Sequence, residues 1–201
     1  MNILETLVLA ADELRRLRVP FALVGGLAVS VRAEPRFTRD IDVAVAVADD
    51  QAAEALVHHF LQVGFRVLAT VEQEATGRLA TVRLAAPGED DDGPIIDLLF
   101  ASSGIEAEIA AAATVESIAP GVDIPVATTG HLIAMKVLAE QPSRFQDSAD
   151  IMALLTTAGP ADLESTRHAV EVIRARGAAR GKDLAAVLER YLALASEAGG
   201  S

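Results

Sequence analysis

Cysteine and tryptophan are absent from this 201-residue sequence, and aromatic residues make up only 3% of it. Without cysteine the chain has no disulfide, no thiolate zinc site and no cysteine nucleophile, which argues against a secreted scaffold held by disulfides. Apolar residues nevertheless account for 51% of the sequence. Length and composition therefore predict one globular domain, alone or with a helical extension, with a core built mainly from Ala, Val, Leu and Ile.

Long apolar runs and an excess of positive charge are also missing. No uninterrupted apolar run reaches the roughly 18 residues of a membrane span, so we expect a cytoplasmic protein without membrane contact. The net charge of −12 argues against a surface that binds nucleic acid over its whole extent, but it does not exclude a local basic patch. Two groups of arginines have helical spacing, and we expect them on solvated helix faces: Arg15, Arg16 and Arg18, and Arg174, Arg176 and Arg180.

Short apolar runs alternate with helical patterns along the first half of the chain. The predicted strands cover residues 21–26, 40–47, 65–71, 77–87 and 94–100, followed by a two-stranded segment within residues 114–128. The predicted helices cover residues 4–17, 27–33, 49–64 and 104–113, and helices follow from residue 129 almost to the end. This order predicts an α/β (α+β) fold: a mixed β-sheet core flanked by helices in residues 1–126, and a C-terminal helical region packed on it in residues 127–201.

An acidic loop, GEDDDG at residues 88–93, joins two of the predicted strands. Its length and glycines suit a hairpin connection. Because consecutive acids beside glycines are usually solvated turn residues, we expect no metal site there.

Three aspartates occupy strand positions that normally take apolar residues. Asp40 and Asp42 are one residue apart in DIDVAVAV, so strand alternation places both side chains on one face, about 7 Å apart. Asp97 stands between apolar residues in PIIDLLF, where a strand favours Val or Ile. Like charges in a partly buried site are costly unless a cation or hydrogen-bond donors compensate them. The pattern therefore predicts a shared oxygen-ligand site for a hard divalent ion such as Mg²⁺.

A glycine pair, Gly25-Gly26, separates the first predicted strand from a helix. Unobstructed backbone amides and the positive end of a helix together form a cradle for phosphate oxygens. We therefore expect the three aspartates to converge on one cleft of the sheet, with the glycine pair at its rim. A phosphate and a metal ion would meet in this cleft.

In order and spacing, Gly25, Gly26, Asp40, Asp42 and Asp97 resemble the signature of nucleotidyltransferases of the DNA polymerase beta type. That signature is a strand, a G-[G/S] pair, a spacer, D-x-D and a later strand acid. The fuller stretch GGLAVSVRAEPRFTRDIDVAV is similar to the branch that contains the abortive-infection (AbiEii-like) toxins. The resemblance spans residues 21–155.

The same branch carries a helix lysine followed by an R-x-x-D-x-x-D stretch, which Lys136, Arg144, Asp147 and Asp150 match. The resemblance implies that Lys136 and Arg144 contact phosphate. From the residues alone, Lys136 equally suits a snorkelling side chain on an amphipathic helix. Asp147 and Asp150 equally suit helix capping or an ion pair with Arg144, so their roles stay open.

The activity implied by the resemblance is transfer of NMP from an NTP to an acceptor hydroxyl, with two Mg²⁺ or Mn²⁺ ions as cofactors. Asp40 and Asp42 would hold both ions, while Asp97 would ligate the second ion and act as general base. The acceptor stays open among tRNA or other RNA, protein and small molecules. The resemblance also implies a toxin-antitoxin pair, with an antitoxin protein as candidate partner.

A second hypothesis is a catalytically inactive relative that binds a nucleotide or a protein as a regulatory module. The intact set of three acids favours the enzyme, because a fold alone gives no reason to keep three costly carboxylates together. Nucleotide preference and oligomeric state stay open.

Overall fold

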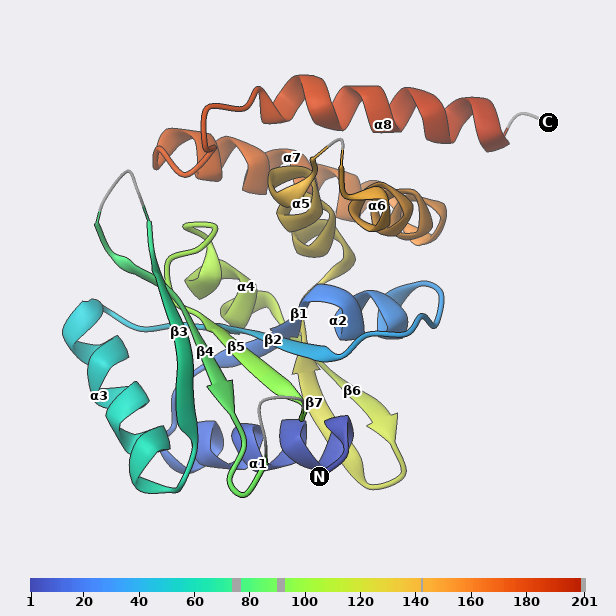
Figure 1. Ribbon diagram of the computed structural model, residues 1–201. Coiled ribbons are helices and arrows are strands. Elements are labelled where there is room, and N and C mark those ends of the chain that lie inside the picture. Colours follow the sequence, from blue (N-terminus) through green and yellow to red (C-terminus); the bar gives the residue numbers. More distant parts are fainter. Residues whose placement is uncertain (74–76, 90–92, 142, 200–201) are drawn as a thin grey trace.

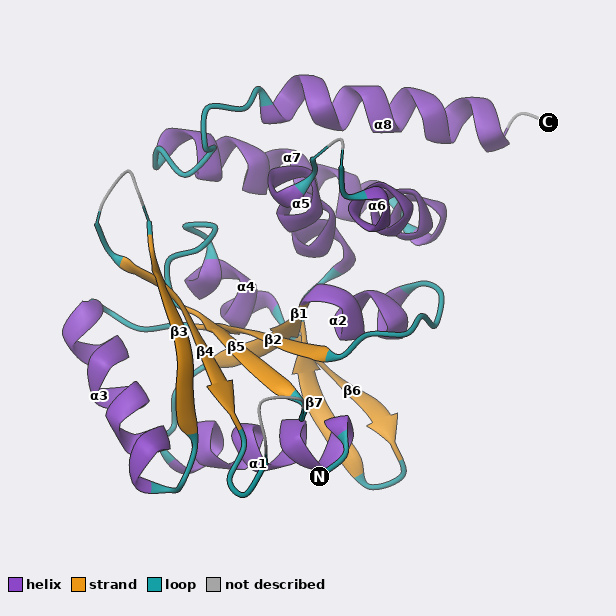
Figure 2. Cartoon of the chain, in the orientation of Figure 1, coloured by secondary structure: helices purple, strands orange, loops and turns teal. Residues whose placement is uncertain are grey.

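The computed structural model describes residues 1–73, 77–89, 93–141 and 143–199, which form seven strands and eight helices (Figures 1 and 2). The strands are β1 (Phe21–Val24), β2 (Asp40–Val45), β3 (Arg66–Glu72), β4 (Leu79–Ala85), β5 (Ile95–Leu99), β6 (Thr114–Ala119) and β7 (Val122–Val126). The helices are α1 (Ile3–Arg16), α2 (Gly25–Arg32), α3 (Asp50–Gln62), α4 (Glu106–Ala112), α5 (Thr129–Ala139), α6 (Phe145–Thr157), α7 (Pro160–Ala175) and α8 (Leu184–Gly199). Residues 90–92 of the acidic loop lie outside the described residues, and so does the prediction that this loop binds no metal.

All strands belong to one mixed sheet in the order β3-β4-β5-β2-β1-β7-β6. The pairs β2–β5 and β1–β7 are parallel, and the other neighbours are antiparallel. In Figure 1, α1 lies below the sheet and α3 lies at its left beside β3, whereas α5 to α8 form a layer above the sheet. This arrangement confirms the predicted α/β (α+β) fold with a mixed sheet and C-terminal helices.

Local signals in the sequence explain where the helices begin and end. Asn2 and Glu5 form a capping box at the start of α1, since each side chain accepts a hydrogen bond from the other residue's backbone N–H. Asp49 caps α3 by accepting a hydrogen bond from the backbone of Ala52 at 2.9 Å. Gly64, with φ of +97°, then reverses the chain into β3.

Strand β2 separates the core from the cleft. Ile41, Val43 and Val45 point to one face and are almost fully buried, while Asp40 and Asp42 alternate with them on the other face. The hydrophobic gain from the first face holds the strand in the centre of the sheet. This burial fixes the side of the sheet to which the two aspartates must point.

The arginines near the C-terminus correct one expectation. Arg176 and Arg180 lie in the turn between α7 and α8, not on a helix face, whereas Arg174 is helical and exposed. The helical spacing of these arginines did not reveal that α7 ends at Ala175. Within the described ranges, no helix combines the length and the apolar character that crossing a bilayer requires.

Candidate active site

Strand pairing places the predicted acids beside one another. Parallel pairing of β2 with β5 sets Asp42 opposite Asp97 and Asp40 opposite Ile95. Paired residues on neighbouring strands share a face of the sheet, so all three carboxylates leave the sheet on the same side. On the far side of β2, antiparallel pairing sets Asp42 opposite Val24, the last residue before the glycine pair.

Gly25 is required by the position of the Asp42 carboxylate. A Cβ atom on residue 25 would lie 1.9 Å from Asp42 Oδ2, and the residue has φ of +64°. Both facts favour glycine, because any larger residue would collide with the carboxylate and strain the backbone. The glycine pair therefore does more than turn the chain: its first member makes room for an acidic side chain against the start of α2.

Gly26 also has a close neighbour. A Cβ atom there would lie 2.4 Å from Arg36 Nη2 and 3.0 Å from Thr38 Oγ1. The missing side chain thus lets the connection between α2 and β2 fold back over the start of α2.

Burial and neighbouring charges disfavour the ionised form of Asp42. Burial, followed by the negative charge of Asp97, raises the pKa of Asp42 to about 6. The charge of Lys136 acts in the opposite direction but is outweighed. Without a bound cation, full ionisation of Asp42 is therefore energetically unfavourable in this site.

Asp97 already has a cationic partner, which the sequence analysis did not identify. Arg83 stands opposite Asp97 on β4 and donates two hydrogen bonds to it, from Nε to Oδ1 at 2.8 Å and from Nη2 to Oδ2 at 2.6 Å. The pairing raises the pKa of Arg83 further. The Asp97 side chain is 9% exposed, so this fork-shaped contact compensates a nearly buried charge. Arg83 breaks an apolar strand just as Asp97 does, and this was the available sequence signal.

Two basic and two acidic side chains form a cluster of alternating charges, here called the charge cluster: Lys136, Asp147, Asp150 and Arg36. Lys136 Nζ lies 3.0 Å from Asp147 Oδ1 and 2.7 Å from Asp150 Oδ2. Arg36 Nε lies 2.8 Å from Asp150 Oδ1. Burial would raise the pKa of Asp150, but hydrogen bonds from Lys136 and Gln146 outweigh it and hold this pKa below its usual value.

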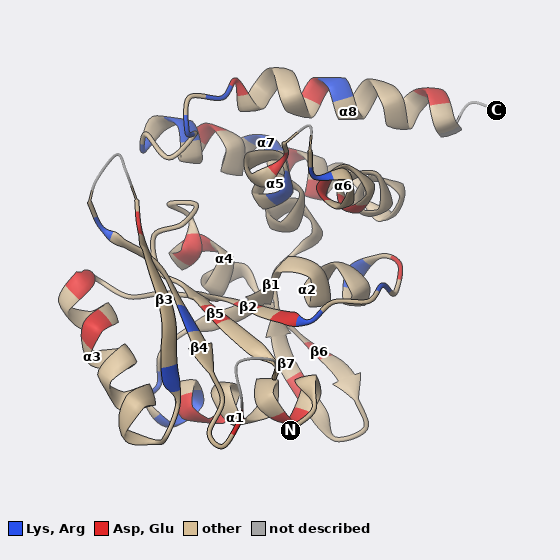
Figure 3. Cartoon of the chain, viewed as in Figure 1, with Lys and Arg blue, Asp and Glu red and all other residues tan. Residues whose placement is uncertain are grey.

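The charge cluster shows which partners these side chains have. Lys136 is 13% exposed and ion-paired, so it does not snorkel to solvent. Asp147 pairs with Lys136, and Asp150 pairs with Lys136 and Arg36. Among the described residues neither acid forms an ion pair with Arg144. Arg36 joins the cluster from the connection before β2, and Figure 3 shows basic colour on α5 and acidic colour on the neighbouring α6. The cluster thus ties this connection to the helical layer.

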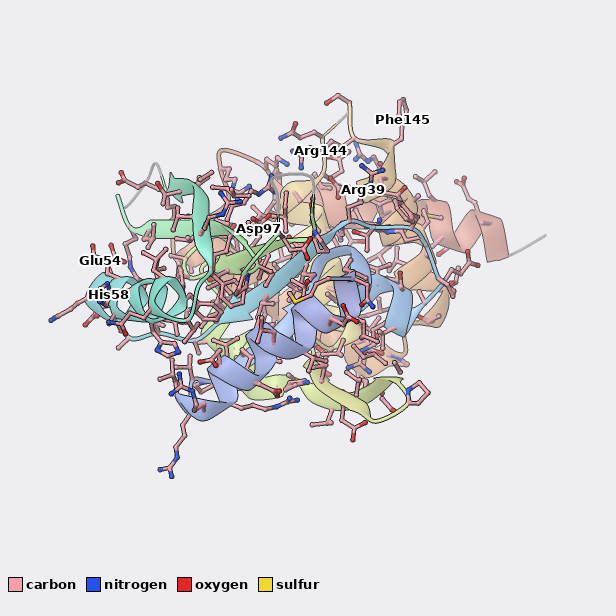
Figure 4. All side chains as sticks on the ribbon, turned by 60° about the horizontal axis from the view of Figure 1, so that its bottom comes forward. Arg39, Glu54, His58, Asp97, Arg144 and Phe145 are labelled. Carbon is pink, nitrogen blue, oxygen red and sulfur yellow. The ribbon has the colours of Figure 1, made fainter. Side chains whose placement is uncertain are left out.

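A cleft of about 300 Å³ opens between the sheet and the helical layer. Its lining brings Gly25, Asp42, Lys136 and Arg144 together with Arg180. Asp97 lines a neighbouring hollow over β3, β4 and β5, which shares Leu99 with the cleft. Figure 4 shows Asp97 among the strands, with Arg39, Arg144 and Phe145 together at one edge of the molecule.

The three aspartates do not form a closed cation site. In the part of the chain that the structure describes, no three Asp, Glu or His side chains are arranged to hold a metal ion. The backbone positions of the three aspartates are nevertheless compatible with a shared cation site. Asp42 and Asp97 are in register, and Asp40 lies two residues before Asp42 on the same face. The side chain of Asp97 is turned toward Arg83. A divalent cation would have to draw this carboxylate partly away from the guanidinium.

Comparison with known proteins bears on the family and the fold. Residues 7–198 match the family described as nucleotidyl transferase AbiEii toxin, Type IV TA system. No curated protein sequence matches the chain.

Several solved structures have a similar fold. The antibiotic-resistance factor ANT(2'')-Ia in solution is 17% identical, with a TM-score of 0.55 over 88% of this chain and 93% of that one. A crystal structure of ANT(2")-Ia with adenylyl-2"-tobramycin is 16% identical, with a TM-score of 0.52 over 86% and 95%. An antigenic nucleotidyltransferase-like protein from Paracoccidioides brasiliensis is 19% identical, with a TM-score of 0.54 over 92% and 90%. At such identities the likeness is one of fold.

Proposed function

The chain belongs to the AbiEii nucleotidyl transferase family, and we propose that it transfers NMP from an NTP to an acceptor hydroxyl in a reaction that requires a divalent cation. One observation carries the proposal: Asp42 stands in register with Asp97 while Gly25 leaves space for its carboxylate. No packing requirement explains two acids in register on neighbouring strands, where burial opposes the ionisation of Asp42. A cation and a phosphate would relieve that opposition.

Asp40, Asp42 and Asp97 would hold two Mg²⁺ ions, or Mn²⁺, since carboxylates with added water and phosphate oxygens suit these hard ions. When bound, the ions would offset the charge of the triphosphate and lower the pKa of the acceptor hydroxyl. We propose residues 1–126 as the nucleotidyltransferase core that carries these acids. Residues 127–201 would form the helical region that closes the cleft from above.

The protein's own groups would divide the remaining work. The backbone amides of Gly25 and Gly26 would bind phosphate oxygens at the start of α2. Asp97 would accept the proton of the acceptor hydroxyl, with Arg83 holding its carboxylate in place until then. Lys136 and Arg144 would contact the triphosphate. Lys136 reaches the cleft already oriented by two carboxylates.

The acceptor is proposed to be RNA such as tRNA, a protein or a small molecule, and the chain to be the toxin of a toxin-antitoxin pair with an antitoxin protein as its partner. The family description supports the toxin role. A structure with adenylylated tobramycin among the similar folds supports including small hydroxyl compounds as candidates.

The test is to incubate the protein with Mg²⁺, each labelled NTP and a mixture of tRNA, total protein and aminoglycosides, and to follow the label. We expect one acceptor class to be labelled by the wild type and none by Asp42→Asn. Wild-type protein that labels no acceptor with any NTP would contradict the transferase.

One observation favours the regulatory alternative: both Asp97 oxygens are engaged by Arg83. Calorimetry separates the two functions, because a triphosphate cannot approach three carboxylates without a cation. The transferase predicts NTP binding only with Mg²⁺. Equal affinity with and without Mg²⁺ would favour the binding module.

A further inference from the structure

The cleft contains three basic side chains, but only two of them lack a carboxylate partner. Lys136 is shared between Asp147 and Asp150. Arg144 and Arg180 also line the cleft, and among the described residues neither forms an ion pair. Their positive charges are therefore the ones left to attract an anion into a cleft that also holds Asp42.

Arg180 is held in an uncommon conformation beside the cleft. Its φ of +54° makes it one of two non-glycine residues with positive φ in the described ranges. Its Nη2 donates to the carbonyl oxygen of Ser102 at 2.8 Å, just beyond β5. The contact joins the exposed Arg180 side chain to Ser102, and both residues line the cleft. The positive φ has a modest conformational cost.

Hydrogen bonds from residues before and after Arg180 hold the turn that carries it. Arg176 donates a hydrogen bond from Nη1 to Oε2 of Glu108 on α4 at 3.1 Å. Lys182 Nζ donates to the carbonyl oxygen of Leu138 on α5 at 2.7 Å. These contacts tie the turn to α4 on one side and to α5, which lines the cleft, on the other, so the backbone that carries Arg180 is held in place.

We propose that Arg180 binds the polyphosphate of the incoming nucleotide, at the β- and γ-phosphates that leave as pyrophosphate. The inference rests on the proposed function. A planar guanidinium with several N–H groups suits phosphate oxygens. The hydrogen-bond acceptors of Arg180 are the carbonyl and hydroxyl oxygens of Ser102, so its positive charge is not neutralised by a carboxylate among the described residues.

In the proposed transfer reaction, Arg180 would act on the leaving group. The acceptor oxygen forms a bond to the α-phosphorus, the α–β phosphoanhydride bond breaks, and its electron pair leaves with pyrophosphate. The acceptor proton passes to Asp97. Arg180 would interact with the charge that grows on the leaving pyrophosphate, so its loss should affect triphosphates and spare monophosphates.

The position of Arg180 also links two spaces. It lines the cleft together with Gly25 and Asp42, and it lines a second cavity of about 580 Å³ together with Glu72 and Thr81. A polyphosphate bound at Arg180 would therefore lie between the glycine pair and this second cavity. Asp97 does not line that cavity.

The experiment measures binding of three probes in the presence of Mg²⁺: an NTP, the matching NMP and inorganic tripolyphosphate. Arg180→Gln should weaken NTP and tripolyphosphate binding about tenfold, the usual scale for one charge-assisted contact, and leave NMP binding unchanged. Arg180→Lys should restore part of the affinity. Arg174→Gln is the matched control, because Arg174 is an exposed arginine on the preceding helix and lies outside the cleft.

The outcomes separate this inference from the proposed function. Wild-type NTP affinity in Arg180→Gln would overturn the role of Arg180 even if the wild type labels an acceptor. Equal losses for NTP and NMP, or a lowered melting temperature that Arg180→Lys does not repair, would assign Arg180 to the fold and overturn the inference. Selective loss of triphosphate binding would support it even if no acceptor were ever labelled. A wild type that binds neither NTP nor tripolyphosphate would overturn both.

Discussion

Replacing Asp42 with asparagine should make the protein more stable above pH 6 and abolish cation-dependent nucleotide binding. Burial, followed by the charge of Asp97, raises the pKa of Asp42 from 3.8 to about 6. The folded chain therefore holds this proton more tightly than the unfolded chain, and stability is lost as the pH rises through 6. At pH 8 the loss is about 3 kcal/mol, because each pH unit between the two pKa values corresponds to about 1.4 kcal/mol.

The loss is smaller in acid, because the folded carboxyl group then keeps its proton, and at pH 5 it is about half as large. Asparagine has the shape of the acid without its charge, so the Asp42→Asn protein does not lose stability through ionisation at this position. Thermal unfolding of Asp42→Asn should therefore have a midpoint about 6 °C or more above the wild type at pH 8, and a smaller gain at pH 5. Asp123→Asn, which changes an exposed aspartate on β7, should leave the midpoint unchanged.

Magnesium supplies a second arm of the same experiment. Binding to the ionised acids should raise the wild-type midpoint at pH 8, whereas Asp42→Asn should respond little. An Asp42→Asn midpoint at or below that of the wild type at pH 8 would refute the reasoning, and so would a gain that does not shrink at pH 5. In either case burial would not be the force acting on this carboxylate.

Three further substitutions test other parts of the site. Gly25→Ala should abolish Mg²⁺-dependent NTP binding in calorimetry, because its Cβ would collide with Asp42; Gly121→Ala, with φ of +75° and open space, shows the effect of backbone strain alone. Asp97→Asn should lower the transfer rate about a hundredfold, the scale for losing a general base, while NTP affinity persists; an unchanged rate would exclude Asp97 as the base. Lys136→Gln should lower the unfolding free energy by about 3 kcal/mol, because the nearly buried Asp150 would keep only Arg36 as a cationic partner. An unchanged unfolding midpoint would show that Lys136 serves ligands alone.

Much of the fold could be predicted because its signals are local. Alternation along 40–45 identified a strand with a core face and an acidic face, and α3 follows from its cap at Asp49 and the glycine that ends it. Boundaries shifted by a few residues, as at α1, which begins at Ile3 and ends at Arg16. The arginine turn after α7 was missed, because helical spacing continues past the point where the helix stops.

Some features of the site could likewise be predicted from local sequence, and others could not. That Asp40 and Asp42 share a face is a property of one strand, and the sequence predicts it from the two-residue period alone. Arg36 belongs to the quoted motif, but nothing in its neighbours indicates that its partner would be Asp150 on α6. Arg180 lies in a turn without periodicity, so no local pattern could place it in the cleft.

The sequence by itself determined which residue types are candidates for the chemistry: two acids on one strand, a third on a later strand, and a glycine pair where a helix begins. Only the tertiary structure decided which of them face each other. Parallel pairing of β2 with β5 set Asp42 beside Asp97, and antiparallel pairing of β4 with β5 gave Asp97 to Arg83. Strand order and register depend on burying the apolar faces of all seven strands at once, and no single segment contains that information.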